Sequence, residues 1–290
     1  MARAILFALM LACCQTVFAA GQLYRVTHDG KTSYLYGTIH VGRGGGYPLD
    51  AVASRALLDS KALVIELDIR EDKAFQLALA RHGRYPNGDV VQNHLTPATL
   101  QKTVQALARA GIPLSSVQHY KPWLIANLLV GAELDKNGYQ RSEAVEYALL
   151  AAAQKQDKTV RELESADYQL SLFDSLDARQ QELYLLENLA DLDDGDSLKK
   201  SQALIEAWRA ADKTGIQAVW KTATTGDSIS AGFMNRVLLG KRNPEMAANI
   251  ERIMQQDQVA FVGVGLLHLV GDDGLPQLLK RRGYQVEQLY

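Results

Sequence analysis

Alternating apolar and polar positions mark both ends of the chain. Residues Leu23–Thr27 and Thr32–Tyr36 alternate and are rich in aromatic and β-branched side chains, and Asp29-Gly30 between them is typical of a hairpin turn. A third β-rich run covers 62–69. Further strands are predicted at 159–163, 259–265 and 284–289. The sequence therefore predicts strands near both ends of the chain.

Helical periodicity fills the middle of the chain. Thr96 is expected to cap a helix that has Pro97 at its first position. A second helix is expected to start at Ser142 and to run to about Gln154. From 176 to 256 the pattern is almost wholly helical, with a break at Asn243-Pro244, where Asn243 is expected to be a helix N-cap. Shorter helices are predicted at 48–58 and 275–282.

No repeat, low-complexity tract or linker divides the chain. If the strands at the two ends form one sheet, the ends of the chain must meet and the helical middle must pack as a layer or cap. We therefore predict a single α/β (or α+β) domain over 21–290, with a mixed sheet built from strands at both ends and a large helical middle segment. A split into two domains is the alternative.

The first twenty residues have the layout of a secretory signal peptide. Arg3 is followed by an uncharged apolar run, 4–14, and then by small residues that favour cleavage after Ala19 or Ala20. The run is too short to span a membrane, which needs about 20 apolar residues. A lipoprotein signal with lipidation at Cys13 is the weaker alternative. We expect an exported protein, periplasmic or secreted.

Removal of the signal peptide would change the chemistry open to the chain. Both cysteines, Cys13 and Cys14, lie within it, so the mature chain would have no disulfide, no thiolate nucleophile and no cysteine-ligated metal. With Arg3 removed, 30 basic residues remain against 33 acidic ones, a net charge of −3. Because no basic cluster stands out, nucleic acid is not expected as a partner. No later segment is apolar enough to span a membrane.

Two similar motifs place a histidine after a predicted strand. Gly37-Thr-Ile-His40 follows the second strand, and Gly265-Leu-Leu-His268 follows the 259–265 strand. Ligands of open α/β sheets bind beyond the carboxyl ends of the strands. If both strands belong to one sheet, the two imidazoles are expected to converge.

Glu66 is the third candidate site residue. Alternation along 62–69 would put Glu66 and Asp68 on one face of a strand and its apolar neighbours on the other. A carboxylate in such an apolar run needs a cation or hydrogen-bond donors. Two histidines and a carboxylate are a common ligand set for a divalent metal ion with open coordination positions, which supports hydrolysis.

A structural interpretation of these residues stays open. A lone histidine after a strand is more often a hydrogen-bonded structural residue, and pairing with a buried arginine is the alternative role of Glu66. Arg242 is more often a surface cation than a functional one. The remaining four histidines are interpreted as surface or structural residues: His28, His82, His94 and His119.

The chain resembles the TraB/GumN family, which is related to the Tiki proteins. The matching segments are Tyr34–His40, Val64–Asp68, Lys121–Trp123, Glu162–Glu164, Arg242-Asn243 and Phe261–Gly271, with Gly274-Leu275 and Gly283-Tyr284 beyond. The resemblance extends over essentially the whole mature chain. It implies a single α/β domain with paired Gly-X-X-His motifs, and Tiki proteins are described as metal-dependent proteases.

The resemblance implies roles for individual residues. His40 and His268 would be ligands of a divalent metal ion, Glu66 a ligand or general base, and Arg242 a supporting catalytic residue. Many relatives have a Gly-hydrophobic-acidic step in mid-chain, which here is Ala144-Val-Glu146. Because alanine replaces the glycine, no role in the site is assigned to this helix.

The leading expectation is a metal-dependent hydrolase, and within that class a peptidase, that acts on a peptide or other small-molecule substrate. The alternative is a non-catalytic periplasmic protein that binds a peptide, a signal molecule or haem in the same cleft. The third is an export-associated scaffold whose histidines are structural.

Overall fold

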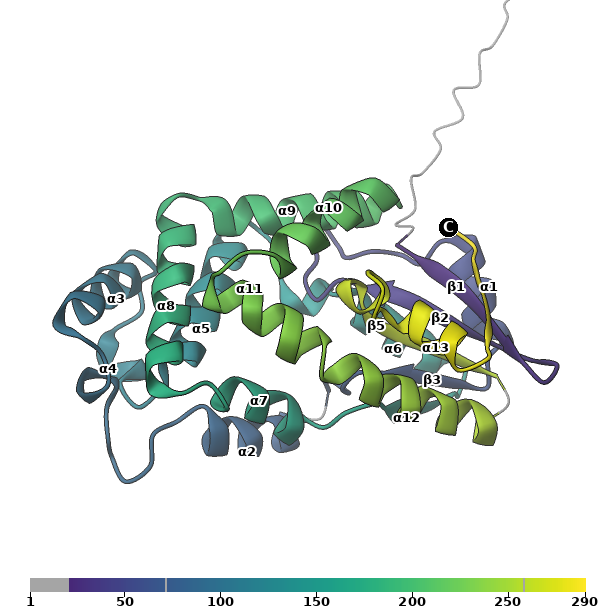
Figure 1. Cartoon of the computed structure of the whole chain (residues 1–290), viewed down its shortest axis with the longest axis horizontal. Coiled ribbons are helices and arrows are strands. Elements are labelled where there is room, and N and C mark those ends of the chain that lie inside the picture. Colours follow the sequence, from purple (N-terminus) through teal and green to yellow (C-terminus); the bar gives the residue numbers. More distant parts are fainter. Residues whose placement is uncertain (1–20, 71, 258) are drawn as a thin grey trace, which may run out of the picture.

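A six-stranded mixed sheet forms one end of the molecule and a group of helices the other (Figure 1). The computed structural model describes residues 21–70, 72–257 and 259–290, so the predicted signal peptide lies outside the described residues. The strands are β1 (Leu23–His28), β2 (Lys31–Thr38), β3 (Ala62–Ile65), β4 (Thr159–Glu162), β5 (Ala260–Gly265) and β6 (Gln285–Gln288). Their order in the sheet is β4-β3-β5-β2-β1-β6.

Strands from both ends of the chain build this sheet, as predicted. β1 and β2 form an antiparallel hairpin, and Asp29 and Gly30 both have positive φ at its turn. β5 lies between β2 and β3 and is parallel to both, while β4 extends the parallel part. The backbone amide of Leu289 donates to the carbonyl of Leu23 (2.8 Å), which ties the last residues to the first strand. The prediction of one α/β domain with a mixed sheet is confirmed.

Helices cover both faces of the sheet. On one face α12 and α13 pack on β5 and its neighbours, and on the other α1 and α6 do so, with Trp208 of α9 in the same core. Every residue of β3 and of β5 is buried, as expected for parallel strands with both faces covered. The bounds of these helices are α1 (Ala51–Asp59), α6 (Val145–Lys155), α9 (Asp196–Arg209), α12 (Arg242–Asp257) and α13 (Leu275–Arg281).

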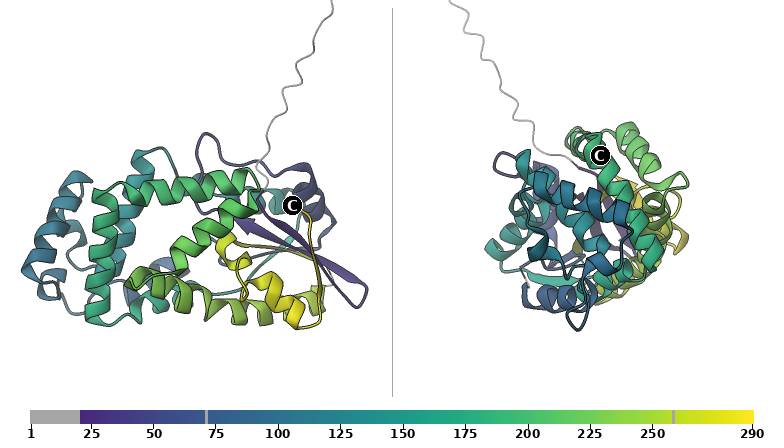
Figure 2. Two further views of the ribbon diagram at one scale, coloured as in Figure 1. Left: turned by 45° about the horizontal axis from the view of Figure 1, so that its top comes forward. Right: turned by 90° about the vertical axis from the view of Figure 1, so that its left-hand side faces the viewer.

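Most of the remaining helices form the part of the molecule farthest from β1 and β6 (Figures 1 and 2), whereas α10 packs on the core of the sheet through Ile216. The remaining helices are α2 (Asp72–His82), α3 (Pro97–Arg109), α4 (Leu114–Val117), α5 (Pro122–Lys136), α7 (Ala166–Asp174), α8 (Ala178–Asp193), α10 (Lys213–Thr224) and α11 (Ile229–Phe233). A π-helical segment, Met234–Leu239, joins α11 to α12, and short 3₁₀ turns lie at 91–93, 141–143 and 266–269. In the part of the chain that the structure describes, no helix combines the length and apolarity of a membrane span.

Thr96 caps α3 as predicted, by accepting a hydrogen bond from the amide of Thr99 with Pro97 at the first position. Three other local predictions are wrong. The third strand ends at Ile65, so Glu66 lies beyond it, in the connection to α2, and not on a strand face. The helix expected from Ser142 begins at Val145, because residues 141–143 form a 3₁₀ turn. The helical stretch breaks at Gly240-Lys241 and not at Asn243-Pro244, which lies within the first turn of α12.

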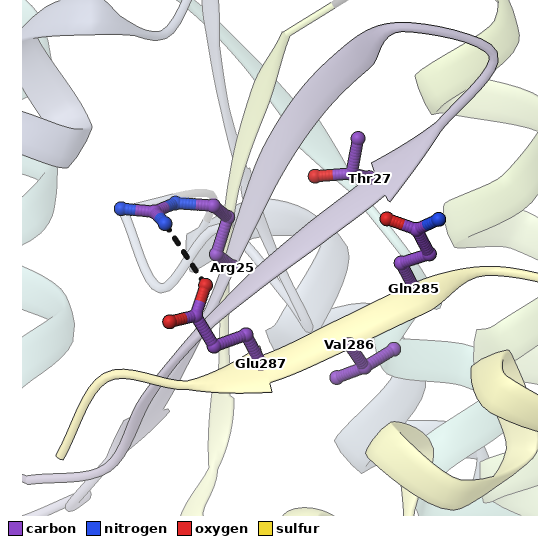
Figure 3. Close-up of a pocket in the computed structure, with 5 residues that line it drawn as sticks. All are labelled: Arg25, Thr27, Gln285, Val286 and Glu287. Carbon is purple, nitrogen blue, oxygen red and sulfur yellow. Dashed lines mark hydrogen bonds and ion pairs between the residues drawn. The ribbon is translucent and has the colours of Figure 1, made fainter.

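A small hollow of about 180 Å³ lies on β1 and β6, where Arg25 pairs with Glu287 at 2.9 Å (Figure 3). Thr27, Gln285 and Val286 complete its lining. It includes none of the candidate site residues.

Candidate functional site

Four neighbouring parallel strands bring the candidate residues to one edge of the sheet. His40 follows β2, Glu66 follows β3, Glu164 follows β4, and His268 follows β5 on a 3₁₀ turn (Leu266–Leu269). Because β4, β3, β5 and β2 are adjacent and parallel, their carboxyl ends meet at the same edge. Residues that are up to 228 positions apart in sequence therefore come together.

Gly265 lets two of these side chains approach the end of β5 closely. A Cβ atom at this position would stand 2.9 Å from Nε2 of His40 and 3.2 Å from Oε1 of Glu66. The Nε2 atom of His268 lies 3.8 Å from the same Glu66 oxygen. The glycine of the second Gly-X-X-His motif thus leaves a space beside the backbone, with an imidazole nitrogen and a carboxylate oxygen at its border.

His40 is held through one ring nitrogen by Glu146. Its Nδ1 atom lies 2.7 Å from Oε1 of Glu146, which also accepts a hydrogen bond from the Thr38 hydroxyl at 2.6 Å. The charge of Glu146 is the main cause that raises the pKa of His40 to about 9. Glu146 comes from the first turn of α6, the helix to which the sequence assigned no role, so that assignment is wrong.

His268 is held in a similar way by Asn243. The Asn243 amide nitrogen donates to the carbonyl of Asp273 (2.8 Å), which orients Oδ1 toward Nδ1 of His268 at 2.5 Å. Nδ1 therefore carries the proton and Nε2 keeps its lone pair. Burial lowers the pKa of His268 to about 4, so the ring is neutral at neutral pH. The prediction that Asn243 is a helix N-cap is wrong, because its side chain is engaged by His268 and Asp273.

Glu66 and Arg242 form the buried charged centre of this edge. Arg242 donates to Oε2 of Glu66 at 2.6 Å and to Oε2 of Glu164 at 2.6 Å, with a further contact from its Nε atom to Glu164. Burial by itself would raise the pKa of Glu66, but His268, Arg242, His40 and the amide of Gly265 together lower it to about 2. Arginine is charged at every accessible pH, so Arg242 stabilises the carboxylate even where His268 is neutral.

A cleft of about 580 Å³ begins at these residues and runs to the helical part of the molecule. His40, Glu66, Glu146 and Arg242 line it at the sheet edge. α5 supplies six and α7 three of the other lining residues, and the lining is largely apolar. A volume of this size lies within the usual range of small-ligand sites, about 300–1,000 Å³.

The residues that the structure describes contain no ready-made metal site. No group of three or more His, Cys, Asp or Glu side chains among them is arranged to hold a metal ion. His40, Glu66, Arg242 and His268 are nevertheless brought together at one edge. The other four histidines make contacts elsewhere, with Tyr284 for His28, Asp167 for His82, and Asp89 for His94 and His119.

A family model covers nearly the whole chain. Residues 22–288 match the model of the TraB/PrgY/gumN family. The chain belongs to this family. It is 26% identical over 256 residues to the uncharacterized protein YbaP of Shigella flexneri, an alignment that covers 86% of this chain and 88% of that protein. It is also 26% identical over 253 residues to the uncharacterized protein YbaP of Escherichia coli strain K12, with 85% and 87% covered. No solved structure matches the chain.

Sequence reasoning did not assign site roles to Glu146, Glu164 or Asn243. Glu164 and Asn243 lie within segments that resemble this family, and Asn243 directly follows the candidate residue Arg242. Their place in these segments is the sequence signal that could have identified them. Glu146 is the acidic residue of the altered mid-chain step, and its contact with His40 shows that the loss of the glycine does not remove the carboxylate from the site.

Proposed function

We propose that this chain is a metal-dependent hydrolase that cleaves peptides outside the cytoplasm, after export by its N-terminal signal peptide. One observation carries the proposal. Nε2 of His40 and Oε1 of Glu66 border the space beside Gly265, and Nε2 of His268 lies 3.8 Å from the same carboxylate oxygen.

The chemistry of the donors fits a divalent ion. Metal-binding histidines use one ring nitrogen for the ion and fix the other by a hydrogen bond to a carboxylate or carbonyl oxygen. His40 and His268 both have Nδ1 fixed in this way, by Glu146 and by Asn243. Nε2 of His268 has a free lone pair, and an ion at Nε2 of His40 would displace the proton that its raised pKa leaves there at neutral pH. His40 would have to turn toward Glu66 for the three side chains to share one ion, and its ring, which is 66% exposed, has the room to do so. His40, His268 and Glu66 would hold it.

A bound divalent ion acidifies a water molecule and polarises a carbonyl, which are the two requirements of peptide hydrolysis. Glu66, ionised at any pH well above 2, accepts a proton at Oε1 or serves as a ligand. Arg242 holds Oε2 of Glu66 and is itself held by Glu164, so the carboxylate keeps its orientation. The cleft places a substrate against this edge.

A second candidate function is capture of a peptide, a signal molecule or haem without turnover. The largely apolar lining of the cleft favours it, because such surfaces bind ligands whether or not a reaction follows. It predicts saturable binding without product, and for haem a Soret band on titration.

The metal content of the mature protein tests the leading proposal. The protein is purified from a metal-replete periplasm and its bound metal is measured by mass spectrometry for wild type, His40→Ala, His268→Ala and, as a matched control, His119→Ala. We expect about one ion per chain in wild type and the control, and loss of the ion in the other two. Wild type without metal, or two site variants that retain it, would contradict the proposal.

Activity and export have separate tests. Cleavage of a peptide mixture should be lost on chelation and restored by a divalent ion, whereas binding that persists without product would support the second candidate. Cell fractionation and N-terminal sequencing should find a periplasmic or secreted chain that begins after Ala19 or Ala20. A cytoplasmic chain that begins at Met1 would contradict export.

A further inference from the structure

A glycine stands in the middle of a helix that lines the cleft. Gly131 belongs to α5 (Pro122–Lys136), has no positive φ, and a Cβ atom built on it would meet no atom within 4 Å. Glycine is a poorer helix former than alanine. Neither backbone conformation nor close packing therefore accounts for the glycine, and what it provides is space in the cleft.

The helix around Gly131 is largely apolar, and the side of it that lines the cleft is covered only in part. Ile125, Ala126 and Leu129 pack into the core that α5 forms with α3 and α8. The side that lines the cleft follows helical spacing from Trp123 through Asn127, Val130 and Gly131 to Leu134. A helix that is apolar all round is normally buried on all sides. Trp123 is buried and stacks on Phe173 of α7, whereas Asn127, Val130, Gly131 and Leu134 stay partly exposed on the cleft side.

Apolar side chains from other elements face the same space. Phe75 of α2 and Phe173 of α7 line the cleft, and Ile69 and Tyr147, each 38% exposed, line it as well. The polar groups that α5 and α7 contribute are Asn127, Asp135 and Gln169. One is Asn127, whose Oδ1 accepts a hydrogen bond from the Tyr184 hydroxyl at 2.9 Å, so that its NH₂ group is the half that can meet a substrate carbonyl.

We infer that the helical end of the cleft is a subsite for a large apolar side chain of the substrate peptide, and that Gly131 sets its depth. The inference rests on the proposed function, because it assumes that the substrate group bound at the sheet edge and the apolar side chain bound at α5 belong to the same peptide. The cleft is continuous from His40 and Glu66 to α5, so one ligand contacts both. Such a ligand must be polar where it meets the sheet edge and apolar where it meets α5, as a peptide with a leucine or phenylalanine side chain is.

Binding of short peptides to the mature chain tests the subsite. The probes are blocked tetrapeptides, Ac-Ala-Xaa-Ala-Ala-NH₂, with alanine, leucine or phenylalanine at Xaa. Their affinities are measured by calorimetry for the protein as purified and after chelation. For wild type we expect the phenylalanine peptide to bind roughly tenfold or more tighter than the alanine peptide, the ratio that burial of a large apolar side chain supplies.

Two variants fill the space in steps. Gly131→Ala should reduce this ratio and Gly131→Leu should bring it near one, while Ala132→Leu, a neighbouring change on α5 outside the cleft lining, should leave it unchanged. Both glycine variants should keep or raise the melting temperature, by about 2 °C, since the added Cβ meets no atom within 4 Å and both residues favour the helix more than glycine does. A retained melting temperature separates a filled subsite from a misfolded chain.

The outcomes separate the subsite from the proposed function. A ratio near one in wild type, or a ratio that Gly131→Leu leaves unchanged, overturns the subsite even if peptides are cleaved. If the peptide affinities show the expected ratios but no peptide is cleaved, the result supports the subsite and contradicts the proposed hydrolase function. The expected ratios together with preferred cleavage of the phenylalanine peptide support both.

Discussion

The Oε1 atom of Glu146 lies 2.7 Å from the Nδ1 atom of His40, although the two residues are 106 positions apart. One carboxylate from α6 thereby fixes the ring of a histidine that follows β2. Because Glu146 holds Nδ1, the Nε2 atom of His40 faces Gly265. A change at Glu146 is therefore expected to alter the pKa of a ring that lies at the sheet edge.

Glu146→Gln should lower the pKa of His40 from about 9 toward its ordinary value of 6.5, because the amide keeps the shape of the side chain but removes the charge. NMR titration of the imidazole in the metal-free protein measures this directly. Glu133→Gln on α5 is the control and should leave the His40 pKa where it is in wild type. An unchanged His40 pKa in Glu146→Gln would show that the pair does not act through charge.

The same pair should make stability depend on pH. The pKa of His40 is raised in the folded state, so its stabilising contribution is complete below pH 6.5 and is lost as pH rises through about 9. In metal-free protein the urea midpoint of wild type should fall across this range relative to Glu146→Gln. High salt should reduce the difference, because the His40 ring is 66% exposed. Parallel pH profiles for the two proteins would contradict this prediction.

Removal of Arg242 should be strongly destabilising. Its guanidinium lies between Glu66 and Glu164, whose side chains are 12% and 3% exposed, and both carboxylates would be left buried without a cation. Loss of one partner of a buried pair costs about 3–5 kcal/mol. The free energy of unfolding of Arg242→Met, from urea titration, should fall by that amount.

A second change in the Arg242→Met protein tests the cause. Glu164→Gln in that background should restore part of the lost stability, because it removes one of the two uncompensated charges. If the double variant is less stable than Arg242→Met alone, the packing of the Arg242 side chain matters more than its charge.

Gly265→Ala should block the space at the end of β5 while the chain still folds. The backbone at Gly265 has φ −51° and ψ 133°, which alanine adopts without strain, but the added methyl would stand 2.9 Å from Nε2 of His40. We expect loss of bound metal with a retained circular dichroism spectrum and a modest change in melting temperature. Retention of the ion by Gly265→Ala would show that the ion does not use this space.

The sequence predicted the parts of this edge that depend on local patterns. The strands before His40 and His268 are recognisable from alternation and apolar runs, and a glycine near each strand end placed both histidines beyond the sheet. Glu66 was placed on a strand face because its neighbours are apolar, but β3 is buried on both faces and ends one residue earlier. Apolar content alone does not show where such a strand stops.

The partners of these residues could not be predicted from local patterns. Many carboxylates are candidates for pairing with Arg242, and only the adjacency of β4 and β3 brings Glu164 and Glu66 together. Asn243 before a proline at the start of a helix suits an N-cap, and the preference was overridden by the nearby His268 and the carbonyl of Asp273. Tertiary contacts decided both cases.

The position of β5 has a consequence for how the protein comes to be active. This strand belongs to the last 31 residues of the chain, yet it sits between β2 and β3 and joins the two halves of the parallel sheet. During synthesis β2 and β3 therefore have no shared neighbour, and the edge that carries His40 and Glu66 stays open. A nascent chain that lacks β5 has no assembled site, so any activity has to wait until this strand has been made and has joined the sheet.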